Sequence, residues 1–193
     1  MIFYKDHDIN NLKYLIGVVK EIKKSKKIEA FKRSCSHVGH DTKLSLGTVN
    51  DPQNIRIGDS CFIGTGFRFF ASGGITIGDA TIISTNCTVH TSNHVYQDAS
   101  HLPYGRKTIL KSVKIGNHVW IGDNVMICPG VIVGDGSIIG MGSVVTKNIP
   151  KLSVVGGNPA TIIKSRNDID SYERNVRNKN YYLKSKSITN LSE

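Results

Sequence analysis

The sequence predicts an all-β protein, a parallel solenoid whose coils each contain three short strands. The main observation is an apolar residue at every sixth position between residues 113 and 150. Its cleanest run comprises Ile115, Ile121, Ile127, Val133, Ile139 and Val145. Glycine directly follows four of these residues, and the position four along is small or β-branched in every unit. A period of six fits neither a helical stripe nor strand alternation, so the segment is an internal repeat.

Each six-residue unit suits one short strand and one turn on one side of a triangular prism. The apolar side chain points inward, and glycine supplies the tight corner. Three units complete a coil, so Ile115 is expected to stack beneath Val133 at about 4.8 Å, the spacing of neighbouring parallel strands. Ile121 should likewise stack beneath Ile139, and Ile127 beneath Val145. A glycine-rich β-sandwich is the alternative, but it would not require six consecutive units in strict phase.

The same rhythm continues upstream with one slip. The phase runs through Ile57, Ile63, Phe69 and Ile75, and two extra residues then reset it to Ile77, Ile83 and Val89. Val38 and Leu44 mark a ragged first coil, and residues 47–54 are not periodic. The register breaks again after His94, and residues 95–112 have mixed polarity with Pro103 and Gly105. A long excursion within a regular solenoid is typical of a functional loop.

The chain of 193 residues is expected to hold one solenoid with appendages at both ends: residues 1–34, 35–164 and 165–193. Leu12, Leu15, Ile16, Val19 and Ile22 form one apolar stripe, so residues 10–28 are predicted to form an amphipathic helix. Residues 165–193 are predicted to form a weak helix followed by a polar tail.

Much of the formal charge of +10 lies at the two ends of the chain. The first helix could therefore pack on the first coil or on another subunit, or it could bind an anionic polymer or a membrane surface. Nucleic acid is a weaker alternative, because no recognition motif accompanies the charge. The chain starts without a signal-peptide pattern, and the apolar run 14–19 is too short to span a bilayer.

Four cysteines are present without a CxxC spacing, at positions 35, 61, 87 and 128. Cys61 and Cys87 fall at inward small positions, where a thiol acts as a compact apolar filler. This pattern favours reduced thiols and a cytoplasmic location over a disulfide framework.

His94 is the candidate for the chemistry, because it stands where the chain leaves its coil, directly before the loop. A neutral imidazole is well suited to removing a proton from a hydroxyl near neutral pH. His90 is a weaker candidate that either supports the site or faces solvent. His101 and His118 are interpreted as ordinary surface residues.

The segments ITIGDATIISTNCTVHTSNH, VKIGNHVWIGDNVMICPGVIVGDGSIIGMGSVVTKNIP and VVGGNPATII resemble the hexapeptide-repeat acyltransferases of the galactoside, maltose and xenobiotic acetyltransferase type. The resemblance covers about residues 55–164 and includes the irregular parts. It implies a left-handed parallel β-helix, an exception to right-handed crossovers. It also implies a homotrimer with active sites between neighbouring prisms. His94 would be the general base, and acetyl-CoA would be the donor, attacked directly by an acceptor hydroxyl.

The resemblance also assigns the donor side by matching positions. Trp120 would lie beside the thioester, and Met141 and Gly142 would bond the pantetheine arm through their backbone. Asp123 occupies a position where relatives place a small polar residue that contacts CoA. The remaining matches, at positions where the family meets the nucleotide phosphates, are Thr146, Lys147, Thr161 and Lys164, with Thr161 standing where relatives often have arginine.

The acceptor side matches less well. Galactoside and maltose enzymes carry an acidic residue just before the ITIGD segment, whereas this chain reads Phe-Ala-Ser-Gly from position 70, with Ser72 in that place. Asn86 either reaches the acceptor or forms a coil corner. The basic ends and the missing carboxylate favour an anionic acceptor, such as a capsular or lipopolysaccharide glycan or its precursor.

Three other functions remain open at this stage. A small molecule such as an antibiotic or serine would use the same chemistry. A zinc enzyme of the γ-carbonic anhydrase type needs three converging histidines, for which His90, His94 and His118 can be proposed, although their spacing does not match that family. No metal is therefore expected. A non-catalytic ice-binding or scaffolding solenoid would show regular outward threonine ladders, which the sequence lacks.

Overall fold

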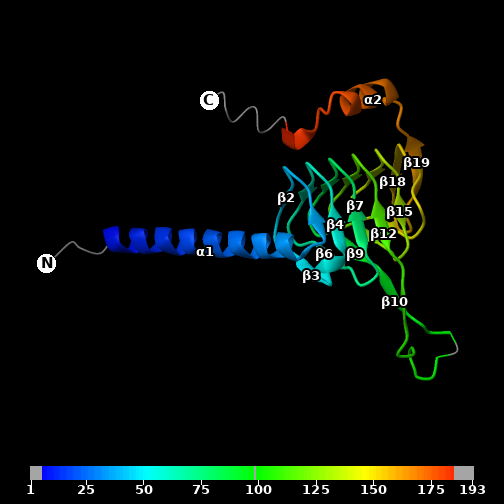
Figure 1. Ribbon diagram of the computed structural model, residues 1–193, viewed down its shortest axis with the longest axis horizontal. Coiled ribbons are helices and arrows are strands. Elements are labelled where there is room, and N and C mark those ends of the chain that lie inside the picture. The colour runs from blue at the N-terminus through cyan, green and yellow to red at the C-terminus, as the bar shows by residue number, and fades with distance from the viewer. Residues whose placement is uncertain (1–5, 98, 185–193) are drawn as a thin grey trace.

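The computed structural model describes the backbone of residues 6–97 and 99–184, and the side chains from residue 13 onward within those ranges. The chain forms a long helix, a three-sided left-handed parallel β-helix and a C-terminal arm, as Figure 1 shows. The predicted fold class is therefore confirmed. The division into three domains stays a prediction. No helix in the described part of the chain is long and apolar enough to cross a membrane.

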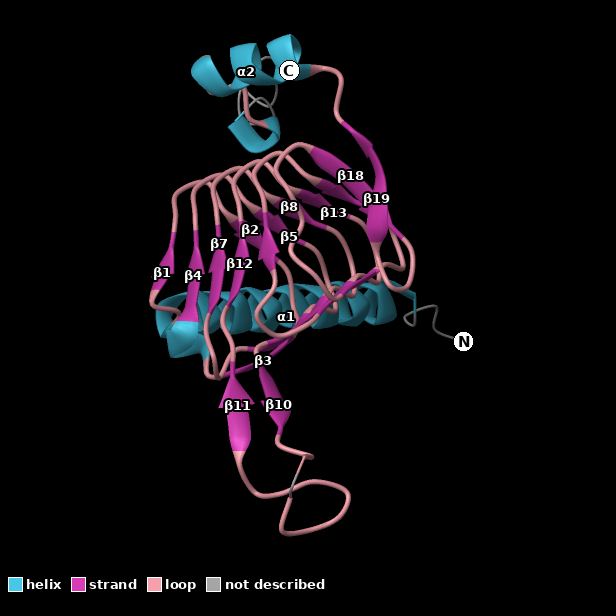
Figure 2. Ribbon diagram, turned by 90° about the vertical axis from the view of Figure 1, so that its right-hand side faces the viewer, coloured by secondary structure: helices cyan, strands magenta, loops and turns pink. Residues whose placement is uncertain are grey.

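Three sheets form the faces of the prism, and Figure 2 shows their strands stacked coil upon coil. Face A consists of β1 (His37–Val38), β4 (Ile55–Ile57), β7 (Ile75–Ile77), β12 (Val113–Ile115) and β15 (Ile132–Val133). Face B consists of β2 (Lys43–Leu44), β5 (Phe62–Ile63), β8 (Ile82–Ile83), β13 (Trp120–Ile121), β16 (Ile138–Ile139), β18 (Ser153–Gly156) and β19 (Thr161–Ser165). Face C consists of β3 (Thr48–Asn50), β6 (Arg68–Phe70), β9 (Thr88–His90), β14 (Met126–Ile127) and β17 (Val144–Val145).

The predicted stacking of inward side chains is confirmed. Ile115 pairs with Val133, Ile121 with Ile139 and Ile127 with Val145, all in parallel register. All six side chains are at most 2 % exposed. Fully burying such a side chain stabilises the fold by roughly 1.5–3 kcal/mol, so the column on each face is a main source of stability.

The predicted place of the slip in phase is wrong. Ile57 pairs with Ile77, and Ile55 pairs with Ile75, so Ile75 does not succeed Phe69 in the inward hexad column. The extra residues lie before β7, in the corner of residues 71–74, where Gly74 has a φ of 95° and its N–H bonds to the carbonyl of Ala71. The longer corner takes up the extra residues, so the strands on either side keep their register and the inward column continues.

The corners between faces A and B explain why an aspartate or asparagine follows glycine in the repeat. The Oδ1 atom of Asp79 accepts the backbone N–H of Asp59 at 2.9 Å, and the side chain of Asn117 accepts that of Asp79 at 2.8 Å. Asp135 then accepts the N–H of Asn117 at 2.7 Å. A Cβ on Gly58 would collide with the Asp79 carboxylate, so the glycine makes room for this ladder.

Before the first full coil, β1, β2 and β3 form the ragged coil that Val38 and Leu44 predict, and the aperiodic segment ends in a short helix, η1 (Pro52–Asn54). Helix α1 (Asp6–Ser34) is longer than predicted and touches the solenoid mainly through its last turns. Ile28, Phe31 and Cys35 pack against the core there, with the Phe31 and Phe67 rings 5.6 Å apart.

Of the roles predicted for the apolar stripe of this helix, packing on the first coil is wrong. Leu15, Ile16, Val19 and Ile22 are all exposed, and the side chain of Leu12 lies outside the described part of the chain. The C-terminal prediction is better: α2 (Ile169–Arg177) follows the antiparallel pair β18 and β19, and residues 185–193 lie outside the description.

Replacing Ile121 by alanine should lower the free energy of unfolding by about 2–5 kcal/mol, because it removes buried methyl groups and leaves a cavity in the column. Denaturant unfolding followed by circular dichroism measures the change. Ile132 points outward and is 47 % exposed, so it is the matched control. Ile132→Ala should stay within about 0.5 kcal/mol of the parent protein. Equal losses in the two variants would contradict the inward and outward assignment.

Candidate active site

His94 lies in a hairpin that leaves the corner between faces C and A. Strand β10 (Ser92–His94) pairs in antiparallel fashion with β11 (Thr108–Leu110), which places His94 opposite Thr108. The hairpin and its loop project well away from the prism (Figure 1). The imidazole is exposed and stacks on Tyr104, with ring centroids 4.0 Å apart and planes 12° apart. Within the described residues no hydrogen bond fixes its tautomer, so Tyr104 is what orients the ring.

A groove runs beside His94 at the base of the hairpin. Its lining combines Asn93 and His94 of β10 with Lys111 after β11. Cys128 and Pro129, from the corner of the next coil, close the other side. The groove therefore offers an imidazole, an amide and an ammonium group over an apolar floor, an arrangement that suits a polar acceptor.

Ser72 occupies the same corner between faces C and A, one coil earlier, and it has a carboxylate partner that sequence reasoning missed. Its hydroxyl donates to Oδ2 of Asp51 at 2.6 Å and accepts from Nδ2 of Asn50 at 3.3 Å. Asp51 lies 21 residues before Ser72 and is brought alongside it by the coil. A carboxylate from the preceding coil therefore lies beside Ser72, although none stands in the sequence just before the ITIGD segment.

The predicted donor residues Trp120, Asp123, Met141 and Gly142 lie on face B and on the corner between faces B and C. Trp120 points outward from β13 and is 55 % exposed. Met141 is 74 % exposed, and an added Cβ at Gly142 would meet no atom within 4 Å. This corner is therefore open to a ligand along its backbone.

Asp123 is held in place by the coil below. Its Oδ1 atom accepts the hydroxyl of Thr85 at 2.7 Å and the backbone N–H of Thr85 at 2.8 Å. These hydrogen bonds, the hydroxyl first, lower the pKa of Asp123 below its ordinary value. Asn86, next to Thr85, is exposed with a φ of 58°, and its backbone N–H bonds to the carbonyl of Thr65. Asn86 therefore forms a coil corner, which was one of its two predicted roles.

The four predicted phosphate-contacting residues are all exposed but lie in two places. Thr146 and Lys147 follow β17, at the corner between faces C and A. Thr161 and Lys164 lie on β19, at the edge of face B. Strand β19 runs antiparallel to β18, a reversal that the hexad pattern did not predict.

One chain does not bring the predicted site residues together. His94 and Ser72 lie at the corner between faces C and A, whereas Trp120 lies on face B. A whole face separates the two groups, and six residues of extended chain span roughly 20 Å. A general base must lie within about 3 Å of the proton that it removes, or reach it through one water.

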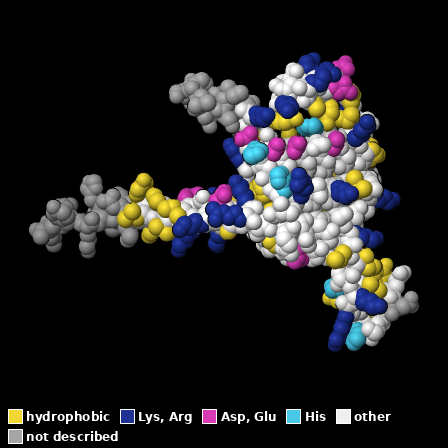
Figure 3. All heavy atoms as spheres, in the orientation of Figure 1, with side chains coloured by type: hydrophobic (Ala, Val, Ile, Leu, Met, Phe, Trp, Pro, Cys, Tyr) yellow, Lys and Arg dark blue, Asp and Glu magenta, His cyan; other side chains and the backbone are white. Residues whose placement is uncertain are grey.

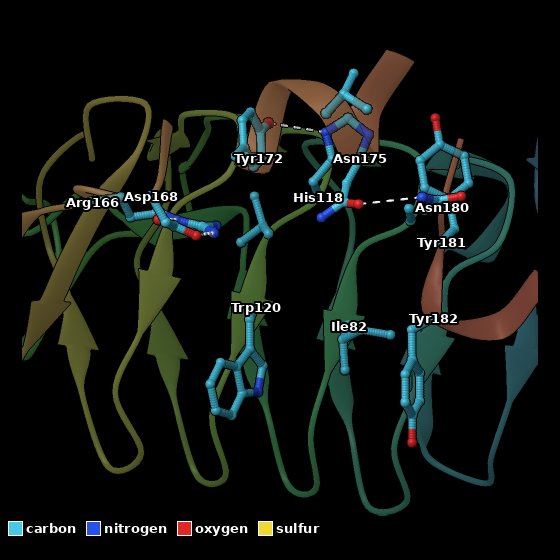
Figure 4. A pocket seen from close by; sticks show the side chains of 13 residues that line it. Ile82, His118, Trp120, Arg166, Asp168, Tyr172, Asn175, Asn180, Tyr181 and Tyr182 are labelled. Atoms are coloured by element: carbon cyan, nitrogen blue, oxygen red, sulfur yellow. Dashed lines mark hydrogen bonds and ion pairs between the residues drawn. The ribbon is translucent and has the colours of Figure 1, made fainter. Parts of the chain in front are cut away.

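His118 is not an ordinary surface residue, so that interpretation is wrong. Its Nδ1 atom lies 3.1 Å from the hydroxyl of Tyr172 in α2, and its Nε2 atom is shielded from solvent without a hydrogen-bond partner in the described structure. Figure 4 shows His118 and Tyr172 meeting at α2, with Trp120 further along the same pocket. The sequence signal was weak because His118 and Tyr172 are 54 residues apart.

Two further histidines, His90 and His101, have partners of their own. His90 on β9 stacks on Phe70, with ring centroids 4.2 Å apart, and His101 contacts Ser100 within the loop. Among the described residues, no three His, Cys, Asp or Glu side chains form a group that could hold a metal ion. The three histidines of the zinc hypothesis are thus not assembled in one chain.

Comparison with known proteins agrees with this architecture. The sequence profile of the bacterial transferase hexapeptide family (six repeats) matches residues 112–147. A hexapeptide-repeat acetyltransferase of Vibrio cholerae is 30 % identical, with a TM-score of 0.66, over 74 % of this chain and 80 % of that one. A maltose O-acetyltransferase of Clostridium difficile 630 is also 30 % identical, with a TM-score of 0.63, over 73 % of this chain and 75 % of that one.

A galactoside acetyltransferase solved with coenzyme A is 31 % identical, with a TM-score of 0.63, over 76 % of this chain and 73 % of that one. The chain belongs to the hexapeptide-repeat acetyltransferase family. It is an acyltransferase, and the resemblance seen in the sequence is confirmed. These structures match about three quarters of the chain, a longer portion than the profile match.

Acid should destabilise the parent acetyltransferase more than a variant in which His118 is replaced by glutamine. Burial lowers the pKa of His118, although Asp135 and Asp79 partly oppose this. The unfolded chain therefore binds a proton more readily than the folded one, and stability is lost as pH falls from about 6.5 toward the folded pKa. Melting temperatures at pH 7.5 and 5.5 compare the parent with His118→Gln, which stays neutral.

The melting temperature of the parent should drop more between the two pH values than that of the variant. His90, whose pKa is also lowered by burial, is present in both proteins and so cancels in the comparison. Equal drops would show that the imidazole under α2 titrates as freely as in the unfolded chain.

Proposed function

We propose that the protein is an acetyl-CoA-dependent O-acetyltransferase that transfers an acetyl group to a sugar hydroxyl. Family membership supports the acyl transfer. The galactoside acetyltransferase was solved with coenzyme A, and the Vibrio cholerae enzyme with acetyl coenzyme A at 29 % identity to this chain. The sugar acceptor is supported by the relatives at 30 % and 31 % identity that act on maltose and galactoside.

His94 would act as the general base in a single transfer step. Its neutral imidazole takes the proton of the acceptor hydroxyl while the oxygen attacks the thioester carbonyl. The carbon–sulfur bond then breaks, and the proton passes to the leaving thiolate. No acyl-enzyme forms, because the hydroxyl itself is the nucleophile. Exposure of the imidazole suits this role, since both substrates must reach it from outside the prism.

The open corner at Met141 and Gly142 fits the extended arm of acetyl-CoA, because nothing in the chain covers the backbone there. Trp120 would contact the thioester end, and Asp123 would stay ionised beside the arm. The nucleotide phosphates would meet Thr161 and Lys164 of one protomer, together with Thr146 and Lys147 of another, since the two pairs lie in different places on one chain. The lysines attract the phosphates by charge.

The separation of His94 from Trp120 is the observation that carries the proposed assembly. If both act on one acceptor and one thioester, a second copy must supply one of them. We therefore propose a homotrimer in which His94 of one protomer faces the Trp120 side of its neighbour, giving three equivalent sites. With three copies around one axis, every site combines His94 of one protomer with Trp120 of the next, and all three interfaces are alike.

Asp51 and Ser72 suit the recognition of sugar hydroxyls. A carboxylate accepts a hydrogen bond from a sugar hydroxyl, and a serine hydroxyl can both donate and accept one. This pair favours a glycan acceptor. It also removes the missing carboxylate as a reason for an anionic acceptor, which leaves the basic chain ends as the other reason. A bacterial capsular or lipopolysaccharide glycan, or its precursor, remains the proposed acceptor on the ground of the basic chain ends. The buried Cys61 and Cys87, whose pKa values burial raises to about 11 and about 12, suit a cytoplasmic location.

The His94→Ala variant should lose about 10²–10⁴-fold in turnover, since that is the usual contribution of a positioned general base. Coenzyme A release from acetyl-CoA measures the rate. His101→Ala, in the same exposed loop, is the matched control and should keep the parent rate. Comparable losses in both variants, or none in either, would contradict the assignment of His94.

The acceptor is identified in the same assay by comparing pools. Glycan fragments and nucleotide-activated sugars form one pool, and serine and hydroxylated antibiotics form the other. Turnover with the first pool alone supports the proposed function. Turnover with the second pool alone would replace it by small-molecule O-acetylation with the same His94 chemistry.

A further inference from the structure

The outer part of α1, residues 13–27, is a surface without a partner in the described structure. Every residue of this segment is exposed, including Tyr14, Leu15, Val18, Val19 and Ile22. Figure 3 shows it standing clear of the prism, with hydrophobic side chains toward its outer end and lysines nearer the body. Apolar residues gathered on an exposed helix usually mark an interaction surface.

The prism of the same chain cannot cover this surface, because α1 carries two apolar faces that point in different directions. At 100° per residue, Tyr14, Leu15, Val18, Val19 and Ile22 share one side of the helix. Ile28, Phe31 and Cys35, which cap the solenoid, are centred about 140° around the helix from that side. While the last turns stay packed on the core, the outer apolar face is held turned away from it.

The charge of the segment favours an anionic partner. Residues 13–27 contain six lysines and one glutamate, Glu21. Four of the lysines, at positions 13, 20, 24 and 27, lie about 180° from the centre of the outer apolar face, whereas Lys23 lies about 110° from it and Lys26 about 50°, one turn beyond Ile22. Most apolar residues on one side and most lysines on the other, with Ile16 and Lys26 as the exceptions, fit a helix that lies in the interface of an anionic bilayer.

We propose that the outer part of α1 binds the surface of an anionic lipid membrane. Tyr14, Val18 and Ile22 would enter the headgroup region, and the lysines would stay at the level of the lipid phosphates. A second copy of the helix is a poorer partner, since it would cover the apolar face but supply no anionic group for the six lysines. Such binding needs no membrane-spanning helix, and it goes beyond the proposed function.

Vesicle sedimentation of the full chain tests this. Vesicles of phosphatidylcholine alone are compared with equal mixtures of phosphatidylcholine and phosphatidylglycerol. The mixed vesicles should bind roughly tenfold more protein, and added salt should release it. Leu15→Glu/Val19→Glu should abolish binding through the apolar face, and Lys20→Glu/Lys24→Glu through the basic face.

Arg174→Glu/Arg177→Glu, an equal charge reversal on the exposed side of α2, is the matched control and should bind like the parent. Loss of binding in this control, or equal binding to both kinds of vesicle, would overturn the proposal. The proposal would also be overturned if the parent did not bind vesicles and the Leu15→Glu/Val19→Glu variant formed smaller oligomers than the parent. In that case α1 would join copies of the chain. A parent that binds polyphosphate but no vesicles would overturn it in favour of a soluble polyanion.

Acetyl transfer to a soluble acceptor should be unchanged in the α1 variants. That readout separates the two proposals, because membrane binding can fail while turnover is intact, and turnover can fail while vesicles still bind.

Discussion

Backbone pairing between successive coils, with one apolar side chain per strand pointing inward, is the constraint on which the rest of the structure depends. Each coil leaves its own column half covered, so it is stable only with a neighbour above and below. The stack demands close corners, where Gly58 makes room for Asp79 and the ladder of Asp and Asn side chains satisfies the turn amides. Outward positions are not constrained by this packing, so they can hold polar and reactive side chains.

The triangular section then decides how that chemistry is distributed. Side chains that share a corner come together even when they are far apart in the chain, as Asp51 and Ser72 do. Side chains on different faces stay apart, as His94 and Trp120 do. A rigid prism cannot bend to join them, so a site that needs both must be built between copies. The same constraint holds for helix α1. Its last turns are packed on the solenoid, and they fix the direction in which the outer apolar face points.

The inward columns could be predicted from the sequence because a six-residue period has one simple geometric solution. Trp120 directly precedes the inward Ile121, so the same period turns it outward, and its side chain is 55 % exposed. Three features escaped: the carboxylate partner of Ser72, the burial of His118 beneath Tyr172, and the corner in which the extra residues before Ile75 lie. Each depends on contacts or register between distant parts of the chain, which the periodicity of one segment does not record. The roles of the site residues stay predictions for a related reason, since the second half of each site would belong to another copy.

Subunit complementation tests the shared site most directly. His94→Ala and Trp120→Ala chains, each expected to be far less active than the parent, are mixed in equal amounts, unfolded together and refolded. Random trimers should regain about a quarter of the parent activity, because one interface in four then joins an intact His94 to an intact Trp120. Activity no higher than that of the two variants refolded separately would contradict a site built between protomers.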